Sequence, residues 1–259
     1  MRVVECVQGS PEWRAARLGI PTASCFDRIL TPKKLELSKS ADDYRAQLLA
    51  EWLLGEPCDG FDAQAFVERG KEFEPRARAA YAFEYDAAVR EVGFVLTDDR
   101  RAGCSPDGLI DAERAGLEIK IPSAKEHVAY MLDPARLRDA YRIQCLGGLL
   151  ATGLETWFLY AWNPLLPSVR VAFRWTQEVD ALEKMEDALA EFCSTLEADK
   201  ARLLAMGCTP YAERQAEEAG AAKSRAAEED ERLFGPPVPA EEAAAPLPPE
   251  DAEFTTTKF

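Results

Sequence analysis

Histidine is almost absent from this sequence, and that scarcity excludes several kinds of active site. The single histidine, His127, stands in the segment KEHVAYML, whose apolar spacing predicts an amphipathic helix. A Ser-His-Asp hydrolase, a Cys-His protease or a histidine-rich metal site would have to be built around this residue, and its neighbours suit none of them. We expect His127 to be a partly exposed helical residue without a catalytic role.

Clustered cysteines are lacking as well. The seven cysteines form no CxxC pair and stand at positions 6, 25, 58, 104, 145, 193 and 208. An odd and scattered set argues against a disulfide framework, a zinc site and an iron–sulfur cluster. We expect most of them to be small buried thiols.

Long apolar runs are missing from the chain. No run approaches the ~18 residues that a membrane-spanning helix needs. The N-terminal segment MRVVECVQGS lacks the apolar stretch and the small-residue cleavage site of a secretory signal. We therefore expect a cytoplasmic protein with no membrane partner.

Positive charge is in short supply, because the formal net charge is -15. From residue 211 onward the chain has twelve acidic and five basic residues, a net of -7, which leaves -8 on the first 210 residues. Nucleic acids are bound by local basic patches, so an acidic total makes DNA binding less expected without excluding it. It predicts that any DNA-binding surface is confined to a groove or channel.

The period of the apolar residues changes along the chain, which predicts an α+β fold. The helical period occurs in segments 11–18, 41–55, 63–85, 124–132, 134–151 and 177–206. Alternating or β-branched segments, typical of strands, are 88–96, 109–121, 155–162 and 168–175. Pro75 should kink its helix or begin a new one. We expect one domain in which helices flank a mixed central β-sheet.

Turn and cap residues mark the expected ends of these helices and strands. Gly19 ends the first short helix, where glycine adopts a left-handed cap at low cost. Ser24 is expected as the N-cap of the next helix, with Asp27 in the capping-box position. Gly116 is expected in the loop of a β-hairpin.

The composition turns acidic and rich in alanine and proline after about residue 209. Residues 212–233 are typical of a frayed helix, and 235–259 cannot bury enough apolar surface to become ordered. We expect a domain over 1–209 and a tail over 210–259 that is disordered in its last part. An appended interaction peptide is the alternative.

The hairpin at 105–120, SPDGLIDAERAGLEIK, carries the candidate chemistry. Strand alternation places Glu118 and Lys120 on one face and the intervening Ile119 on the apolar face. Asp107 begins the partner strand. One of the two register parities aligns Asp107 with the other two side chains, and the sequence leaves the parity open.

Phosphodiester cleavage uses such a set of groups. Carboxylate oxygens hold Mg²⁺, which binds the scissile phosphate and makes a bound water more acidic. A lysine beside the ion can orient that water and stabilise negative charge. By spacing alone, a turn followed by a solvated Glu-x-Lys pair is the more common explanation of such a hairpin.

Two further groups of residues add to this hypothesis. Trp13 and Arg17 lie one turn apart on a helix, and Ser24 follows at the next helix start, which together suit a phosphate. Glu74 offers another carboxylate, and Gln144 shares a helix face with the tyrosine three residues before it. Each of these has an ordinary structural interpretation when taken alone.

Taken in order, these segments resemble the phage lambda exonuclease family, also called the YqaJ-like viral recombinases. The resemblance spans roughly residues 8–175. It rests on the motifs WRAARLGIPTAS (13–24), RGKEFE (69–74), CSPDGL (104–109), LEIK (117–120) and YRIQ (141–144).

The resemblance implies a restriction-endonuclease-like core, within the PD-(D/E)XK superfamily, and a metal centre. Asp107 and Glu118, with the main-chain carbonyl of Ile119, would hold Mg²⁺, for which Mn²⁺ would substitute. Two ions are expected, and Glu74 would support the second ion or its water. Lys120 would position the nucleophile.

The other implied roles concern substrate and partners. Gln144 resembles the family's active-site glutamine, and Arg17, Ser24 and Ser105 would bind the 5′-phosphate of a DNA end. The expected activity is 5′-to-3′ digestion of one strand of linear duplex DNA, leaving a 3′ single strand for an annealing protein. A ring-shaped homotrimer around DNA is expected, and a lined channel would suit the acidic total charge.

Other functions share the same metal centre. A Cas4-like nuclease would need a four-cysteine cluster, which the scattered cysteines do not supply, and a RecB-like enzyme would act with a helicase, whose Walker motif is absent. A structure-selective endonuclease and a non-catalytic DNA-end-binding protein on the same fold are the remaining alternatives.

Overall fold

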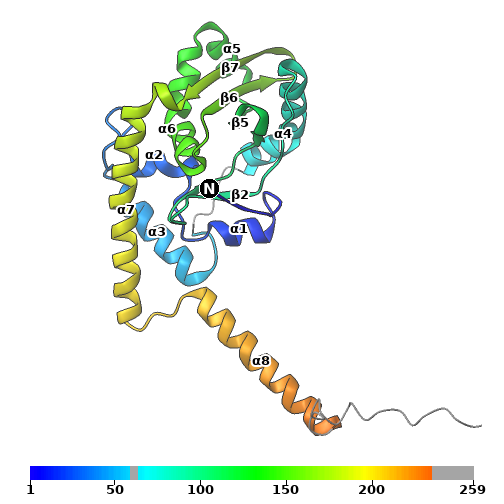
Figure 1. Cartoon of the computed structure of the whole chain (residues 1–259), viewed down its shortest axis with the longest axis vertical. Coiled ribbons are helices and arrows are strands. Elements are labelled where there is room, and N and C mark those ends of the chain that lie inside the picture. The colour runs from blue at the N-terminus through cyan, green and yellow to red at the C-terminus, as the bar shows by residue number, and fades with distance from the viewer. Residues whose placement is uncertain (59–63, 235–259) are drawn as a thin grey trace, which may run out of the picture. The chain divides into compact units, whose positions relative to one another are not determined.

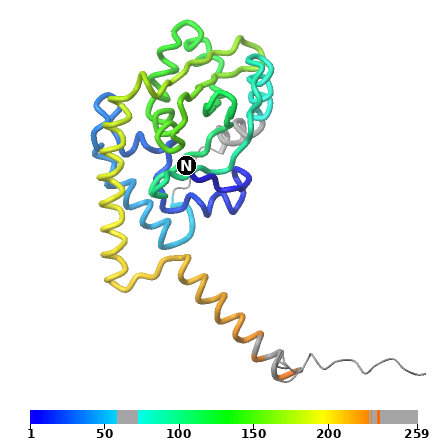
Figure 2. The backbone as a smooth tube through the Cα atoms, in the orientation of Figure 1, coloured from blue at the N-terminus to red at the C-terminus, as the bar shows by residue number. Residues whose placement is uncertain are grey.

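The computed structural model describes residues 1–58 and 64–234 of the chain, and the side chains of 64–72, 227, 229–231 and 234 are outside that description. The chain divides into two units, Met1–Tyr211 and Ala212–Phe259. All of the strands that the structure describes belong to the first unit, which carries the candidate site. Figures 1 and 2 trace the chain through it.

A mixed four-stranded sheet forms the centre of the first unit (Figure 1). Its strands, in spatial order, are β4 (Gly108–Ile110), β5 (Ala115–Lys120), β6 (Thr156–Asn163) and β7 (Leu166–Arg174). β5 and β6 are parallel, and the two outer pairs are antiparallel. A second, antiparallel sheet consists of β1 (Arg2–Val4), β2 (Phe94–Leu96) and β3 (Gly103–Cys104).

Helices cover both faces of the central sheet, because its strands are apolar on both sides. On one face, α4 (Gln64–Tyr85) packs Ala77 and Tyr81 against the buried side chains of β5 and β6. On the other face lie α5 (Ala124–Leu132) and α6 (Pro134–Thr152). The expected α+β fold with a helix-flanked mixed sheet is therefore confirmed.

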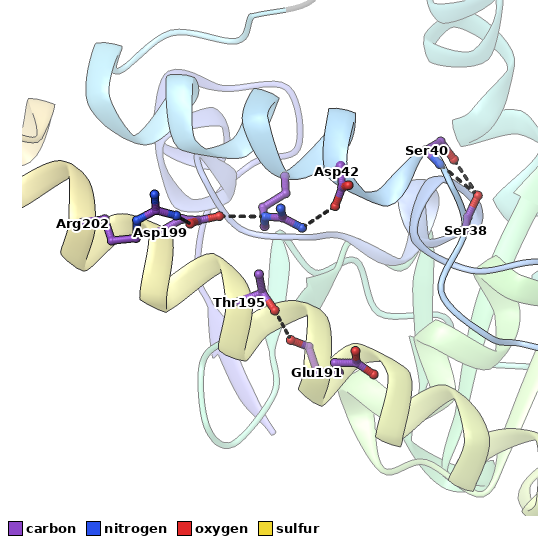
Figure 3. Close-up of polar contacts among 8 residues, drawn as sticks. Ser38, Ser40, Asp42, Glu191, Thr195, Asp199 and Arg202 are labelled. Carbon is purple, nitrogen blue, oxygen red and sulfur yellow. Dashed lines mark hydrogen bonds and ion pairs between the residues drawn. The ribbon is translucent and has the colours of Figure 1, made fainter.

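Shorter N-terminal elements and one long helix complete the first unit. They are α1 (Pro11–Arg17), the 3₁₀ turn η1 (Ala23–Cys25), α2 (Phe26–Ile29), α3 (Ala41–Leu54) and α7 (Val179–Ala205). Arg45 on α3 donates to Asp199 on α7 at 2.9 Å and to Asp42 at 2.8 Å. Figure 3 shows Asp42 and Asp199 on their two helices. This ion-pair network joins α3 to α7.

Two expectations about helix ends and prolines are settled by the backbone. Gly19 takes the expected left-handed conformation with φ 67° just after α1, and Gly55 does the same with φ 79° at the end of α3. Pro75 lies inside α4, which continues through it to Tyr85. The proline therefore does not begin a separate helix.

The expected position of Gly116 is wrong. The turn of the hairpin is the 3₁₀ segment Asp111–Glu113 followed by Arg114 in the left-handed region, and Gly116 lies inside β5 opposite Leu109. A Cβ atom on Gly116 would stand 2.3 Å from the ring of Trp157. The glycine is needed for this close packing of a tryptophan on the neighbouring strand, and a turn signal was the wrong interpretation.

Two other expectations are corrected by tertiary contacts. Ser24 lies within the 3₁₀ turn, and the preceding cap position belongs to Thr22, which makes no capping hydrogen bond. His127 is fully buried, with 0% exposure, and its Nε2 lies 2.8 Å from the main-chain oxygen of Pro167. Since a carbonyl only accepts, the ring donates there. The helix pattern predicted the helix but not that β7 covers this face.

The remaining expectations concern cysteines, membranes and the tail. All seven cysteines are free, but only Cys104, Cys145 and Cys193 are buried. Over the described residues, no helix is both long and apolar enough to cross a bilayer. α8 (Tyr211–Phe234), which belongs to the second unit from its second residue onward, covers the segment expected as a frayed helix. The segment 235–259, expected to be disordered, lies outside the described residues.

Candidate active site

Asp107 is fixed beside β5 by two main-chain contacts. Its N–H donates to the carbonyl of Leu117 at 2.9 Å, and its Oδ2 accepts from the N–H of Ile119 at 2.6 Å. Asp107 therefore lies across the hairpin from Glu118. The sequence left two register parities open. The structure has the parity that places the carboxylates of Asp107 and Glu118 on the same face of the hairpin.

Glu118, Lys120 and Gln144 form a closed set of contacts. Lys120 Nζ lies 2.8 Å from Glu118 Oε1 and donates to Gln144 Oε1 at 3.0 Å. Gln144 Nε2 donates to Glu118 Oε1 at 2.6 Å. The glutamine comes from α6, which packs on the same face of the sheet, so a helix and a strand hold one another's polar side chains in place.

The placement of these side chains follows from strand alternation. Leu117 and Ile119 face the apolar core under α4, as expected. Glu118 points to the opposite face and is only 5% exposed. A buried carboxylate needs compensating partners. Lys120 and Gln144 supply them.

A second group of polar residues surrounds the hydroxyl of Ser105. Trp13 Nε1 donates to Ser105 Oγ at 2.9 Å, and Arg17 Nη1 donates to it at 3.3 Å. The Arg17 guanidinium stacks on the Trp13 ring at 4.1 Å. Its Nη2 also donates to Thr22 Oγ1 at 3.4 Å, and that hydroxyl lies 3.3 Å from Ser24 Oγ. Arg17, Ser24 and Ser105 are thus linked through Thr22 and Trp13.

Both groups open into one cavity of about 150 Å³, although Lys120 and Thr22 do not line it. It is lined by Gln8, Trp13, Arg17, Ala23, Ser24, Cys104, Ser105, Asp107, Glu118, Gln144 and Trp157. The cavity joins the residues expected to bind a 5′-phosphate to those expected to bind metal. The family resemblance implied both sets of residues, but no local pattern places them in one cavity, because the lining comes from segments far apart in the chain.

Glu74 takes a more distant place than the other candidates. It does not line the cavity, and its Oε1 accepts from Arg78 Nη2 at 2.5 Å on the same helix. It nevertheless acts electrostatically on the site, because its charge contributes to raising the pKa of Asp107. Glu74 therefore lies near the candidate metal centre and is paired with Arg78.

The charged groups of the site shift one another's pKa values. Burial raises the pKa of Asp107 well above its usual range, and the carboxylates of Glu118 and Glu74 raise it further. Burial also raises the pKa of Glu74, which Arg78 partly offsets. For Lys120, burial lowers the pKa, but the carboxylates of Glu118 and Asp107 outweigh it and the pKa is raised. Lys120 therefore remains an ammonium at neutral pH.

The donor groups fit a divalent cation of the hard, oxygen-binding kind. Within the described residues, no three His, Cys, Asp or Glu side chains are grouped as metal ligands. Asp107 and Glu118 lie opposite each other across the hairpin, and the N–H of Ile119 donates to Asp107 Oδ2. The carboxylates of Asp107, Glu118 and Glu74 outnumber the cations Lys120 and Arg78. A divalent ion would offset that excess.

Sequence reasoning missed two residues that contact the turn before β4. Arg78 Nε donates to the carbonyl of Asp107 at 2.8 Å. Gln8 Nε2 donates to the carbonyl of Pro106 at 2.8 Å. The spacing of Glu74 and Arg78, four residues apart on a helix, could have pointed to the first. We find no sequence signal for the second.

The fold and the site define the class of protein. One face of the mixed sheet presents the buried Glu118 with Lys120, and the half-buried Asp107 lies beside them, a set of groups that suits phosphodiester hydrolysis. The chain belongs to the family of YqaJ-like viral recombinase domains, which matches residues 12–155. The family resemblance drawn from the motifs is therefore confirmed, and the protein is a nuclease.

Solved structures support the same assignment. The alkaline exonuclease LHK-Exo from Laribacter hongkongensis is 28% identical, with a TM-score of 0.65 over 76% of this chain and 98% of that chain. Its complex with dAMP gives 29% identity and a TM-score of 0.63 over the same shares, 76% and 98%. A phage-related exonuclease from Haemophilus somnus 129PT, 12% identical with a TM-score of 0.51 over 70% and 96%, shares the fold. No curated protein matches the chain.

Proposed function

We propose that the protein is a divalent-metal-dependent exonuclease that digests one strand of linear double-stranded DNA from 5′ to 3′. The observation that carries this proposal is the shared cavity, in which Arg17 and Ser105 stand beside Asp107 and Glu118. A phosphate bound at one end of so small a cavity lies close to the carboxylates at the other. The similar solved structures are those of an alkaline exonuclease, which supports the same activity.

The metal-binding role falls to Asp107 and Glu118 with the main-chain carbonyl of Ile119. We propose Mg²⁺ as the ion, with Mn²⁺ as a substitute, and a second ion supported by Glu74. A bound ion supplies positive charge to the scissile phosphate and makes a water molecule more acidic.

The chain's own residues would do the rest of the catalytic work. The Lys120 ammonium orients the attacking water and stabilises negative charge that develops on the phosphate. Gln144 holds Lys120 and Glu118 together through its amide oxygen and nitrogen. Both side chains are thereby fixed before substrate arrives, which lowers the cost of ordering them during the reaction.

The 5′-phosphate would be bound by Arg17, Ser24 and Ser105. Burial lowers the pKa of Arg17, yet a guanidinium remains protonated under ordinary conditions, so it offers a fixed cation. Its stacking on Trp13 leaves Nη1 directed at the Ser105 hydroxyl and Nη2 at the Thr22 hydroxyl. An arginine and two hydroxyls suit a phosphate monoester.

We propose that residues 1–209 form the nuclease domain and 210–259 an acidic tail. The products would be 3′ single strands for a single-strand-annealing protein, which places the enzyme in phage-type recombination. A homotrimeric ring with an enclosed channel would reconcile DNA binding with the net charge of -15.

The end dependence of the activity is the first test. With Mg²⁺ present, we expect linear duplex to be degraded and covalently closed circular duplex of the same sequence to persist. Loss of label from the 5′ end before the 3′ end would support the proposed direction. EDTA should stop the reaction. Degradation of the closed circle would instead favour a structure-selective endonuclease.

The 5′-phosphate pocket makes a second prediction. Arg17→Ala should reduce the preference for 5′-phosphorylated over 5′-hydroxyl linear duplex by roughly 10-fold or more, since a charge-assisted hydrogen bond contributes about 1.5–3 kcal/mol. Initial rates on the two substrates measure this preference.

Arg14→Ala is the matched control, because Arg14 is exposed on the same helix, α1. Its variant should keep the wild-type preference. Equal rates on both ends in the wild-type protein would remove the pocket from the proposal.

A further inference from the structure

Arg78 on α4 makes polar contacts in three directions at the candidate metal centre. Its Nε donates to the main-chain oxygen of Asp107 at 2.8 Å, and its Nη2 donates to Glu74 Oε1 at 2.5 Å. Its Nη1 lies 2.8 Å from Glu91 Oε1. The side chain is 12% exposed. All three nitrogens of the guanidinium are therefore used, and two of them hold residues assigned to the metal centre.

The planar guanidinium suits this task and an ammonium does not. Its five N–H groups have a fixed fork geometry, whereas lysine carries a single nitrogen on a flexible stem. One lysine nitrogen could approach Glu74 or the Asp107 carbonyl, but the separate contacts from three nitrogens would be lost.

The turn that carries Asp107 depends on such side-chain contacts. Gln8 Nε2 donates to the carbonyl of Pro106 at 2.8 Å and to that of Val92 at 3.0 Å. Arg78 donates to the next carbonyl along the chain, that of Asp107. Two consecutive carbonyls before β4 are thus held by side chains from the N-terminal segment and from α4, and neither holder belongs to the central sheet.

We propose that Arg78 is a positioning residue that fixes Asp107 and Glu74 relative to each other for a divalent cation. This inference rests on the proposed function, because it assigns a role at the same metal centre. Arg78 touches Asp107 through its main chain and Glu74 through its carboxylate, so a shift of α4 moves both. Removing a group that orients metal ligands typically costs about 10–100-fold in metal affinity or activity.

The test is direct metal binding by the full-length protein without DNA. Isothermal titration with Mn²⁺ should show Arg78→Lys and Arg78→Met binding at least ~10-fold more weakly than wild type. The Mg²⁺ concentration for half-maximal cleavage should rise in parallel. Arg78→Lys keeps the charge, so its failure to restore binding would separate geometry from electrostatics.

Arg90→Met is the matched control. Arg90 forms an exposed ion pair with Asp111 in the neighbouring hairpin, and its side chain is 46% exposed. This variant should bind Mn²⁺ as the wild type does. Thermal unfolding of each variant in EDTA reports on the fold separately from the metal site.

Several outcomes would overturn the inference. If Arg78→Lys binds Mn²⁺ like wild type, only the charge of Arg78 matters. If the melting temperature falls while Mn²⁺ affinity is unchanged, the residue is structural. A wild-type protein that neither binds Mn²⁺ nor cleaves DNA would overturn the proposed function and this inference together, whereas normal wild-type binding with unaffected Arg78 variants would overturn this inference alone.

Discussion

Lys120→Ala is expected to abolish cleavage while DNA binding stays within a few-fold of wild type. Removing one charge-stabilising group from a preorganised site lowers kcat by about 10²–10³-fold. Lys120 contacts Glu118 and Gln144 rather than the residues of the 5′-phosphate pocket, so the pocket should survive. Single-turnover cleavage of linear duplex and fluorescence anisotropy with labelled duplex measure the two effects separately.

Lys125→Ala supplies the matched control, since Lys125 is an exposed lysine on α5. It should cleave at the wild-type rate. Melting curves must accompany the Lys120→Ala measurement, because Glu118 loses its cation and an unpaired buried charge destabilises a fold. Unchanged cleavage by folded Lys120→Ala would mean that another group positions the nucleophile.

Local patterns in the sequence predicted most of the fold correctly. Apolar alternation in β5 predicted that Glu118 and Lys120 leave the core face, and the structure has them there. The 3.6-residue period predicted α5 and α6 almost to their ends. Both predictions rest on periodicity within one segment, which needs no knowledge of tertiary neighbours.

Predictions that depended on a neighbour failed. Gly116 was expected in a turn because glycine favours turns, but the ring of Trp157 on another strand determines its place. His127 was expected to be partly exposed, but β7 covers it. A glycine or a histidine can occupy several structural settings. The contact that decides which one it occupies can come from a residue tens of positions away.

The candidate site shows the same division between local and tertiary information. The sequence offered Asp107, Glu118 and Lys120 as a set but left the hairpin parity open. The contact from Ile119 N–H to Asp107 Oδ2 identifies the parity. The resemblance implied a phosphate pocket beside the metal site, but no local pattern could show the cavity, because it forms only where α1 and η1 meet the turn before β4.

Asp107→Asn is expected to eliminate cleavage and yet to stabilise the metal-free protein. If Asp107 holds the ion as proposed, loss of its carboxylate removes several kcal/mol of charge stabilisation, so cleavage should fall by roughly 10³-fold. Asparagine can still accept from Ile119 N–H through its carbonyl oxygen. The buried negative charge disappears, and with it the repulsion from Glu118 and Glu74 that raises the pKa of Asp107.

The sign of the stability change follows from that raised pKa. An aspartate whose pKa is higher in the folded than in the unfolded state keeps a proton that the unfolded chain releases above about pH 4. The folded state of the wild type therefore loses stability as pH rises from the unfolded pKa to the folded one. Asp107→Asn lacks this loss, so its advantage should be larger above that window than below it.

Urea unfolding in EDTA, at about pH 4 and again at about pH 8, measures this difference. Asp111→Asn is the control, because Asp111 is exposed and the hydrogen bond from Arg90 lowers its pKa, so neutralising it should give no such gain. Adding Mg²⁺ should stabilise wild type more than Asp107→Asn, since ligand binding to the folded state shifts unfolding. If Asp107→Asn is the less stable protein at the higher pH in EDTA, then the buried carboxylate is not under electrostatic strain. The divalent cation would in that case have no excess negative charge to offset.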